Sequence, residues 1–441
     1  MQWQKQLIVL IVLTLCNAWP ASGLAHDNHM VEEVLKVLRA NGQISDQQYQ
    51  ELLGKAHASE SSQASPPTPA RPTVGYKPGR GFEFESADGK HTLAIGGRTQ
   101  IRWGYTDRDG GASGRSDESE FRIRSAQLWW QGHVFSPELR YFFQTEILNG
   151  GVDILDYLFH YQYQPWLGIR FGQFRPGQAR QELLPIGTLQ FTERSLANDF
   201  FNVGRDIGTE LLGSLWEKRL HYQFGIFNGN GLNQRQRSTD FLYAGRVQFD
   251  PLGPFPAGEP DLDNLQHPRL SFGLSSQFNK VGKKDIARLS ADNDALENII
   301  IRPGFSGDNI DIWTSTADVA FKWRGFSFVS EYYFGNITTD RAFDFGSGSP
   351  NRTFDAYGWY GQAGYFIIPQ HLEAAFRYSL VDPDNNALDF TFRDEIRGAL
   401  NYYFYGQNLK LQTDIGTVRT ARKRRQDRDE LEARIQLQLM F

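Results

Sequence analysis

The chain has 441 residues, of which 46 are Lys or Arg and 51 are Asp or Glu, so its formal net charge is −5. This acidic balance argues against a nucleic-acid partner. Beyond the first 25 residues there is no stretch of 18 apolar residues, which excludes a membrane protein built from helices. Hydrophobic residues make up 40% of the chain and charged residues 22%, a mixture that fits a sheet protein with interleaved apolar and polar positions.

The first segment has the features of a secretory signal peptide. Lys5 gives it a positive start, residues 7–15 form an apolar core, and residues 23–25 (Gly-Leu-Ala) make a small-x-small cleavage site. We therefore expect residues 1–25 to be removed, together with Cys16, the one cysteine of the sequence. The mature chain then has no thiol for disulfides or metal binding.

The next two segments also lie outside the main domain. Residues 26–57 carry apolar residues at helical spacing in two runs and predict a short helical hairpin, too small to be stable alone. It is either a tethered appendage or a contact with a neighbouring subunit or the cell wall. Residues 58–80 are rich in Ser and Pro and predict a linker without packing capacity.

The main domain, residues 81–441, reads as a succession of strands. Sixteen are expected, at residues 92–106, 120–135, 138–149, 152–163, 166–174, 208–217, 219–228, 240–250, 269–279, 311–323, 326–337, 354–367, 371–381, 391–405, 409–420 and 429–441. Connections after even-numbered strands are mostly tight and those after odd-numbered strands mostly long. Short turns at one end and long loops at the other are typical of a transmembrane barrel. The short connection at 149–151 and the long one at 251–268 depart from this alternation.

The last strand shows the two-residue alternation most clearly. Residues 431–441 read L-E-A-R-I-Q-L-Q-L-M-F, so one face is apolar and the other charged or amide. In a transmembrane barrel the apolar face meets lipid and the polar face meets water. Sixteen strands enclose an aqueous channel, and a sheet in hydrocarbon must close because every backbone group has to be paired. The terminal Phe441 resembles the last residue of Gram-negative outer-membrane barrels, whose assembly machinery reads such a strand.

The connection at residues 175–207 is long and unusually apolar for a solvent loop. A segment with its own apolar clusters needs a place to pack, so we expect it to fold inward and narrow the channel. Its charged residues balance; they are Arg175, Arg180, Arg194 and Arg205 against Glu182, Glu193, Asp199 and Asp206. Fixed guanidinium groups in a narrow throat favour anions. The alternative is that Arg194 and Arg205 hold the loop together through internal salt bridges.

A second group of arginines lies on the first predicted hairpin. Arg98 and Arg102 share the polar face of one strand, and Arg122 and Arg124 alternate with apolar residues on the next, which brings Arg102 near Arg124. Like charges opposite each other on a sheet are unfavourable, so this patch needs anions or carboxylates. It is either a ladder that guides anions, or it is neutralised by Glu118, Glu120 or the inward loop.

Near the end of the chain, the predicted strands carry charges of both signs. Arg377 is expected near Glu395, in a solvated, salt-bridged wall. The basic run at residues 422–425 lies in the last outer loop, where it could meet anions or the phosphates of lipopolysaccharide.

Three stretches resemble the phosphate-selective porin O/P family: G-Q-F-R-P at 172–176, T-E-R-S-L at 192–196 and G-R-D-I-G at 204–208. The resemblance extends more loosely from about residue 82 to the end of the chain. It implies a homotrimeric outer-membrane channel whose third loop forms a constriction lined by arginines and lysines. On matching positions it implies that Arg175, Arg194 and Arg205 line the ion pathway, with Arg180 as a less direct match.

Together these observations predict an all-β protein, a 16-stranded antiparallel transmembrane β-barrel with a long inward-folded third loop, preceded by a short helical hairpin. It would lie in the Gram-negative outer membrane, in contact with lipid and lipopolysaccharide, with its N-terminal extension in the periplasm. We expect passive diffusion of small hydrophilic solutes with a preference for anions such as phosphate, without catalysis, cofactor or metal. The alternatives are a general or cation-preferring porin, a structural or adhesive barrel, and a barrel enzyme such as a phospholipase.

Overall fold

The computed structural model describes residues 36, 39–40, 45–47, 49–50, 72–108, 117–286, 305, 307, 309–345, 348–383, 390–422 and 427–441. The chain forms two units, Met1–Ala70 and Arg71–Phe441. In the first unit the described residues are largely helical, and Arg39 forms an ion pair with Asp46 at 2.5 Å. The predicted signal peptide (1–25), most of the predicted helical hairpin (26–57) and most of the predicted linker (58–80) lie outside the described residues.

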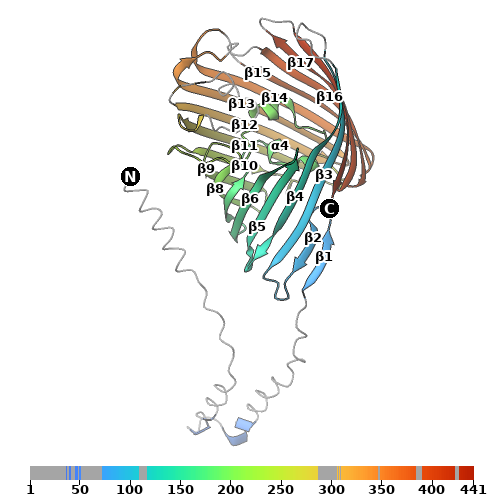
Figure 1. Cartoon of the computed structure of the whole chain (residues 1–441). Coiled ribbons are helices and arrows are strands. Elements are labelled where there is room, and N and C mark those ends of the chain that lie inside the picture. The colour runs from blue at the N-terminus through green and yellow to red at the C-terminus, as the bar shows by residue number, and fades with distance from the viewer. Residues whose placement is uncertain are drawn as a thin grey trace. The chain divides into compact units, whose positions relative to one another are not determined.

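The second unit is a closed antiparallel barrel of sixteen strands (Figure 1). They are β3 (Thr92–Arg108), β4 (Glu118–Val134), β5 (Ser136–Leu148), β6 (Gly151–Gln164), β7 (Leu167–Phe174), β8 (Asp206–Leu215), β9 (Leu220–Phe227), β10 (Leu242–Phe249), β11 (Arg269–Gly282), β12 (Asn309–Trp323), β13 (Phe326–Phe343), β14 (Asn351–Ile368), β15 (Leu372–Pro383), β16 (Phe390–Tyr405), β17 (Leu409–Arg422) and β18 (Arg428–Met440). Each strand pairs with the next along the chain, and β18 closes the barrel on β3, with Glu430 opposite Arg108 and Met440 opposite Arg98. Every one of the sixteen predicted strands overlaps one of these, so the predicted barrel is confirmed.

A hairpin that the sequence analysis missed precedes the barrel. β1 (Thr73–Lys77) pairs with β2 (Gly81–Glu85), and β2 pairs with the first residues of β3, Phe82 lying opposite Ile95. β1 falls within the segment predicted to be a linker. The turn between the strands begins at Pro78-Gly79, a typical turn dipeptide, and Gly79 has a φ of 77°. The last part of the predicted linker is therefore a strand.

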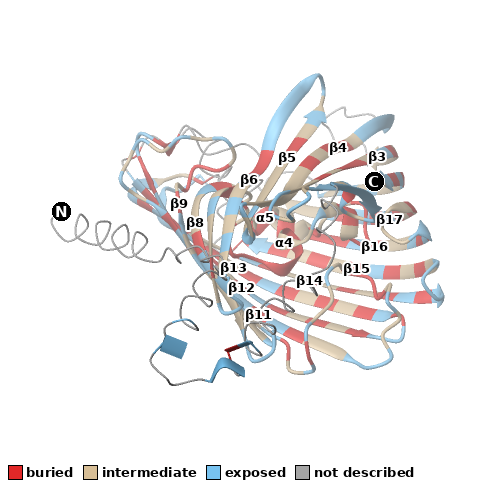
Figure 2. Cartoon of the chain, turned by 90° about the horizontal axis from the view of Figure 1, so that it is seen from below, coloured by how far each residue is buried: buried red, intermediate tan, exposed pale blue. Residues whose placement is uncertain are grey.

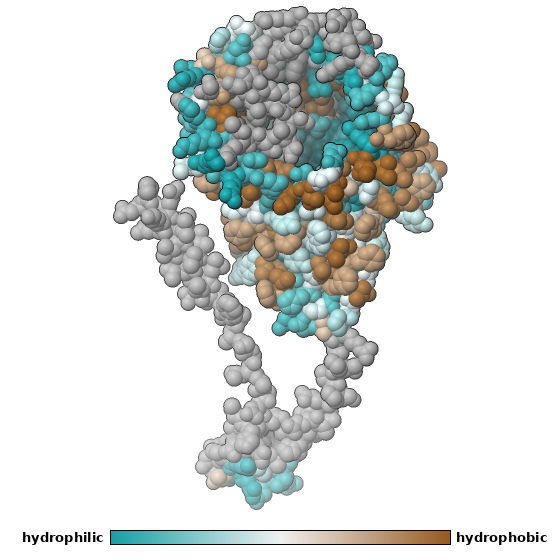
Figure 3. All heavy atoms as spheres, in the orientation of Figure 1, coloured by the Kyte–Doolittle hydropathy of each residue, from teal (hydrophilic) through white to brown (hydrophobic). Residues whose placement is uncertain are grey.

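Burial in the barrel is the reverse of burial in a soluble protein. The inner face is polar and buried: Arg377 and Arg397 are both 0% exposed. The outer face is apolar and exposed, as for Phe121 at 81% and Leu274 at 65%. Figure 3 shows the apolar side chains as a brown belt around the visible flank of the barrel, as expected for a surface in contact with lipid. Among the described residues, no helix is long and apolar enough to cross a bilayer.

Close packing between neighbouring strands depends on a glycine in β7. Gly172 has a φ of 128°, which side-chain-bearing residues rarely adopt, and a Cβ at this position would lie 2.0 Å from the carbonyl oxygen of Tyr157 on β6. By contrast, a Cβ at Gly104 on β3 would have no neighbouring atom within 4 Å. A methyl group is therefore expected to destabilise the fold much more at Gly172 than at Gly104.

We predict that Gly172→Ala destabilises the barrel by about 1–3 kcal/mol, because it adds both backbone strain and a clash with a strand carbonyl. Gly104→Ala, the matched control, should leave stability within about 0.5 kcal/mol of the wild type. The measurement is unfolding by urea in lipid vesicles, followed by the electrophoretic shift between folded and unfolded barrel. Equal midpoints for the two variants would contradict this account of Gly172.

Candidate functional site

The segment between β7 and β8, residues 175–205, is called L3 below. It contains the short helices α4 (Arg180–Leu183), η1 (Ile186–Thr188) and α5 (Leu196–Phe201). Ser195 caps α5 by accepting a hydrogen bond from the Asn198 N–H at 3.1 Å. Seen from below in Figure 2, α4 and α5 lie within the ring of strands.

Buried carboxylates of the inner wall hold the backbone of L3. The two oxygens of Glu331 on β13 accept hydrogen bonds from the backbone N–H groups of Arg180 at 2.8 Å and Gln181 at 2.7 Å. On β17, Asp414 accepts one from the N–H of Thr192 at 3.0 Å. A backbone outside a sheet must find other partners for its donors, and a buried carboxylate must find donors. The hydrogen bonds between the backbone N–H groups of L3 and these carboxylates satisfy both groups at once.

The long connection between β10 and β11, residues 250–268, also binds L3. Glu259 accepts a hydrogen bond from the Gln190 N–H at 2.7 Å, and its own N–H donates to the carbonyl oxygen of Thr188 at 3.2 Å. L3 also packs on the wall through Phe201 of α5, which stacks on Tyr333 of β13 with ring centroids 5.4 Å apart. L3 and this connection thus pack together on the side of the barrel formed by β11–β17.

Arg102 and Arg124 converge on Glu193 of L3. The Arg102 Nη1 and the Arg124 Nε lie 2.5 Å and 2.6 Å from the same oxygen, Oε1, of Glu193. Burial raises the pKa of the Glu193 carboxyl, but the two guanidinium groups outweigh burial and hold that pKa well below its usual range. Arg122, directly opposite Arg102 in the strand register, is half-exposed and pairs with Glu120 at 3.2 Å. This geometry favours the alternative in which L3 and Glu120 neutralise the patch.

Arg175 and Arg194 share Glu182 in the same way. Their Nε atoms lie 2.7 Å and 3.0 Å from the two oxygens of Glu182. Arg194 also donates to the carbonyl oxygen of Leu184 at 2.9 Å. Burial opposes ionisation of Glu182, yet Arg194 and Arg175 keep the pKa of its carboxyl below the usual range. Arg194 therefore sits in internal bonds of L3, as the alternative interpretation expected.

Arg180 is a buried anchor. Its Nε lies 2.7 Å from Asp318 of β12, and its Nη2 donates to the Ser271 hydroxyl of β11 at 2.6 Å. Asp318 also pairs with Arg246 of β10 at 2.7 Å. The Arg180 side chain thus ties L3 to β11 and β12, and Asp318 links it to Arg246 of β10. The predicted contact between Arg377 and Glu395 is also present, at 2.7 Å.

The predicted arginines not yet placed face a cavity of about 730 Å³ between L3 and the wall formed by β3–β7. Arg98, Arg175 and Arg205 line it, and Arg205 pairs with Asp156 at 2.8 Å. Asp156 is the one carboxylate among the described residues that line this cavity. Burial and the nearby Arg205 lower the pKa of Arg175 to about 10, so it stays charged at neutral pH. We call this space the basic cavity.

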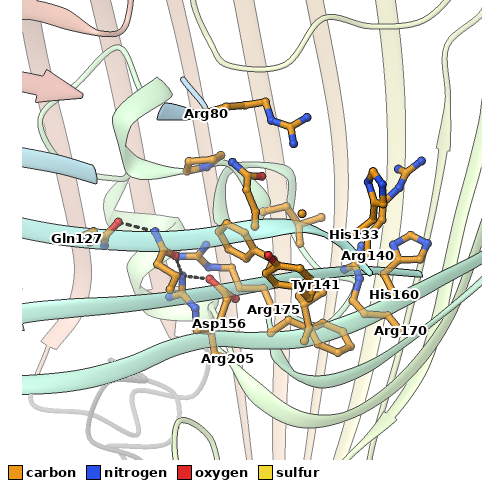
Figure 4. Close-up of a pocket in the computed structure, with 18 of the residues that line it drawn as sticks. Arg80, Gln127, His133, Arg140, Tyr141, Asp156, His160, Arg170, Arg175 and Arg205 are labelled. Atoms are coloured by element: carbon orange, nitrogen blue, oxygen red, sulfur yellow. Dashed lines mark hydrogen bonds and ion pairs between the residues drawn. The ribbon is translucent and has the colours of Figure 1, made fainter. Parts of the chain in front are cut away.

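Further basic residues of the cavity escaped the sequence analysis. Arg80, His133, Arg140, His160 and Arg170 also line it, and Figure 4 shows the last four grouped apart from Arg175 and Arg205. The strand register places these four side by side, His133 opposite Arg140, Arg140 opposite His160, and His160 opposite Arg170. The signal was present in the sequence: all four fall at polar-face positions close to the tight Ser136-Pro137 and Gln164-Pro165 turns, which fix how neighbouring strands align.

The sequence of residues 94–441 matches the model of the family described as phosphate-selective porin O and P. The chain belongs to this family. It is accordingly a porin, an integral β-barrel channel of the outer membrane. No curated protein matches its sequence closely enough to count as a relative.

Solved structures of porins share the fold at low sequence identity. An anion-selective porin from Comamonas acidovorans is 10% identical, with a TM-score of 0.52 over 80% of this chain and 100% of the other. The outer membrane channel DcaP of Acinetobacter baumannii is 10% identical, with a TM-score of 0.52 over 84% of this chain and 100% of the other. Salmonella typhi OmpF, solved in complex with daunomycin, is 12% identical, with a TM-score of 0.50 over 80% and 98%. At this identity the likeness concerns the fold alone.

We predict that Glu193→Gln makes the porin more permeable to chloride relative to potassium by a factor of about 3–10, because the charges of Arg102 and Arg124 lose their shared counter-ion. Glu120→Gln, which removes an exposed carboxylate from Arg122, is the matched control and should change the ratio less. Zero-current potentials in planar bilayers under a salt gradient measure both. An unchanged ratio in the Glu193 variant would contradict the neutralising role of this residue.

The same pair of proteins tests the lowered pKa of Glu193. A carboxyl whose pKa is depressed in the folded protein stays charged, and keeps its ion pairs, until the pH falls through that lowered pKa. The difference in chloride preference between wild type and Glu193→Gln should therefore persist at pH 4.5, where an ordinary glutamate is half protonated. Loss of about half of the difference by pH 4.5 would show an ordinary carboxyl.

Proposed function

We propose that this porin passes small hydrophilic solutes by passive diffusion and prefers anions, with phosphate among its solutes. The observation that supports the proposal is the basic cavity. Among the described residues that line it there are six arginines and two histidines but one carboxylate, Asp156. L3 would be the inward-folded loop that narrows the channel, and the basic cavity would be the passage left beside it.

The chemistry of the cavity suits an anion that binds briefly and leaves. Guanidinium groups present forked donors that match phosphate or carboxylate oxygens. Arg98 is 4% exposed and forms no ion pair with any described residue; its Nη2 donates to Gln127. Arginines at several heights of the wall offer successive weak sites, which conduction requires. Arg140 and Arg170 would form the level nearest the tight turns, and Arg98, Arg175 and Arg205 the level beside L3.

The setting of the channel is also a proposal. An even number of strands puts both ends of the barrel domain on the side of the tight turns, so the N-terminal extension would lie in the periplasm. The family resemblance suggests a homotrimer, and the long outer loops with their basic residues would meet lipopolysaccharide. The assembly machinery would read β18 and the terminal Phe441.

A general porin without charge preference is the second candidate. Its support is the extent of charge pairing, since Glu193, Glu182 and Asp156 each bind at least one arginine of the predicted pathway. If these pairs cancel the field in the passage, ions of both signs would cross equally.

We predict a zero-current potential of the sign for chloride permeation under a potassium chloride gradient, and a conductance that falls when phosphate is added. Arg98→Gln should reduce the chloride preference by a factor of about 3–10 and weaken the phosphate block. Arg324→Gln is the control of equal charge, since Arg324 is exposed in the turn between β12 and β13. A potassium-selective or non-selective wild-type channel would refute the anion preference and leave a general porin.

A further inference from the structure

The basic cavity also carries an apolar band. Phe142 of β5 and Leu158 of β6 line it and lie directly opposite each other in the strand register. Two residues along the same strands toward the tight turns, Arg140 and His160 form the neighbouring pair. The inner wall of a water-filled barrel is ordinarily polar, so a pair of apolar side chains between two basic levels needs an explanation.

L3 faces this band with apolar groups of its own. Leu183, Pro185 and Ile186 line the same cavity. Pro185 is exposed, so its ring is open to the space of the cavity. Apolar groups on both sides of a basic passage leave a slot whose middle repels water while its ends attract negative charge. An inorganic anion has no apolar group that could bind between these side chains.

A second cavity, of about 1110 Å³, opens from the first. The two share Arg98, Gln131, Phe142, Gln144 and Pro185 among their lining residues, and Trp129 lines the second. The indole of Trp129 is held in place by its Nε1, which donates to the carbonyl oxygen of Arg80 at 3.4 Å. Apolar surface therefore continues from Phe142 past Arg98 into a larger space.

Arg98 stands at the junction with unused hydrogen-bonding capacity. Its Nε is buried and has no partner among the described residues. The backbone of L3 comes close to it because residue 187 is glycine: a Cβ there would lie 2.6 Å from the Arg98 Nη1. A buried guanidinium with an unpaired donor, beside an aromatic ring and an apolar loop, is a site that an anion with an apolar body would complete.

We propose that the two joined cavities bind organic anions, namely carboxylates or phosphate monoesters that carry an aromatic ring or a short alkyl chain, in preference to inorganic phosphate. The anionic group binds at Arg98 and its neighbouring arginines, and the apolar body lies against Phe142, Trp129 and Pro185. The inference rests on the proposed anion preference and narrows its substrate class.

The experiment measures the conductance of the full-length porin in planar bilayers while phenyl phosphate, glycerol 3-phosphate or inorganic phosphate is added. Phenyl phosphate and glycerol 3-phosphate carry the same anionic group on bodies of similar size, one apolar and one polar. Burial of a phenyl ring should lower the half-blocking concentration of phenyl phosphate about tenfold below those of the other two anions. Equal half-blocking concentrations for phenyl phosphate and glycerol 3-phosphate would overturn the proposal.

Two variants at one position locate the site. Phe142→Gln should bring phenyl phosphate to the level of glycerol 3-phosphate while the block by inorganic phosphate stays unchanged, which also shows that the channel is folded. Phe142→Leu keeps an apolar group and should retain most of the preference. A preference that survives in Phe142→Gln would overturn the assigned site. Block by inorganic phosphate without a preference for phenyl phosphate refutes this inference alone, whereas absence of any block refutes the anion preference as well.

Discussion

The hydrogen bonds from backbone N–H groups of L3 to buried carboxylates are the constraint on which the rest of the site depends. Glu331, Glu259 and Asp414 are 0%, 1% and 4% exposed and could not remain there as unpartnered charges. L3, in turn, has no strand partner for these donors. Because the acceptors lie on β13, β17 and the connection after β10, L3 is fixed on that side of the barrel, and the basic cavity lies between L3 and β3–β7.

This placement separates the charges of a nearly neutral loop. Within L3 and where L3 contacts the first hairpin of the barrel, arginines form ion pairs with glutamates. Glu193 pairs with Arg102 and Arg124, and Glu182 pairs with Arg175 and Arg194. Along β5–β7 the basic residues come from the wall: Arg170 pairs with Glu210 at 3.4 Å, whereas Arg140 forms no ion pair with any described residue and donates to the carbonyl oxygen of Pro137. A chain with a net charge of −5 can therefore contain a cavity whose charged lining residues are mostly basic. Net charge says little about a channel because selectivity depends on which groups face the solute.

The strands could be predicted because a two-residue period is local, and a barrel wall imposes it from end to end. The contact between Arg377 and Glu395 could be predicted as well, but the partners of the arginines near L3 could not. Glu193 is far from Arg102 and Arg124 in sequence, and a bulge between Gln100 and Ile101 places Arg122, not Arg124, directly opposite Arg102. The basic row that includes Arg140 and Arg170 needs the register of four strands at once, which alternation within single strands does not give. Hairpin β1–β2 was missed because its few residues follow a long Ser/Pro-rich stretch.

That hairpin affects how the barrel closes. β18 and β2 occupy the same edge of β3: the backbone of Phe441 bonds to Gly97, while Phe82 lies opposite Ile95. One residue of β3 separates the two partners. A slide of the closing strand by two residues toward the tight turns would push it into space that β2 already fills. The hairpin β1–β2 thus blocks this slide of β18 along β3. A short element outside the barrel therefore limits the registers in which the first and last strands of the barrel can pair.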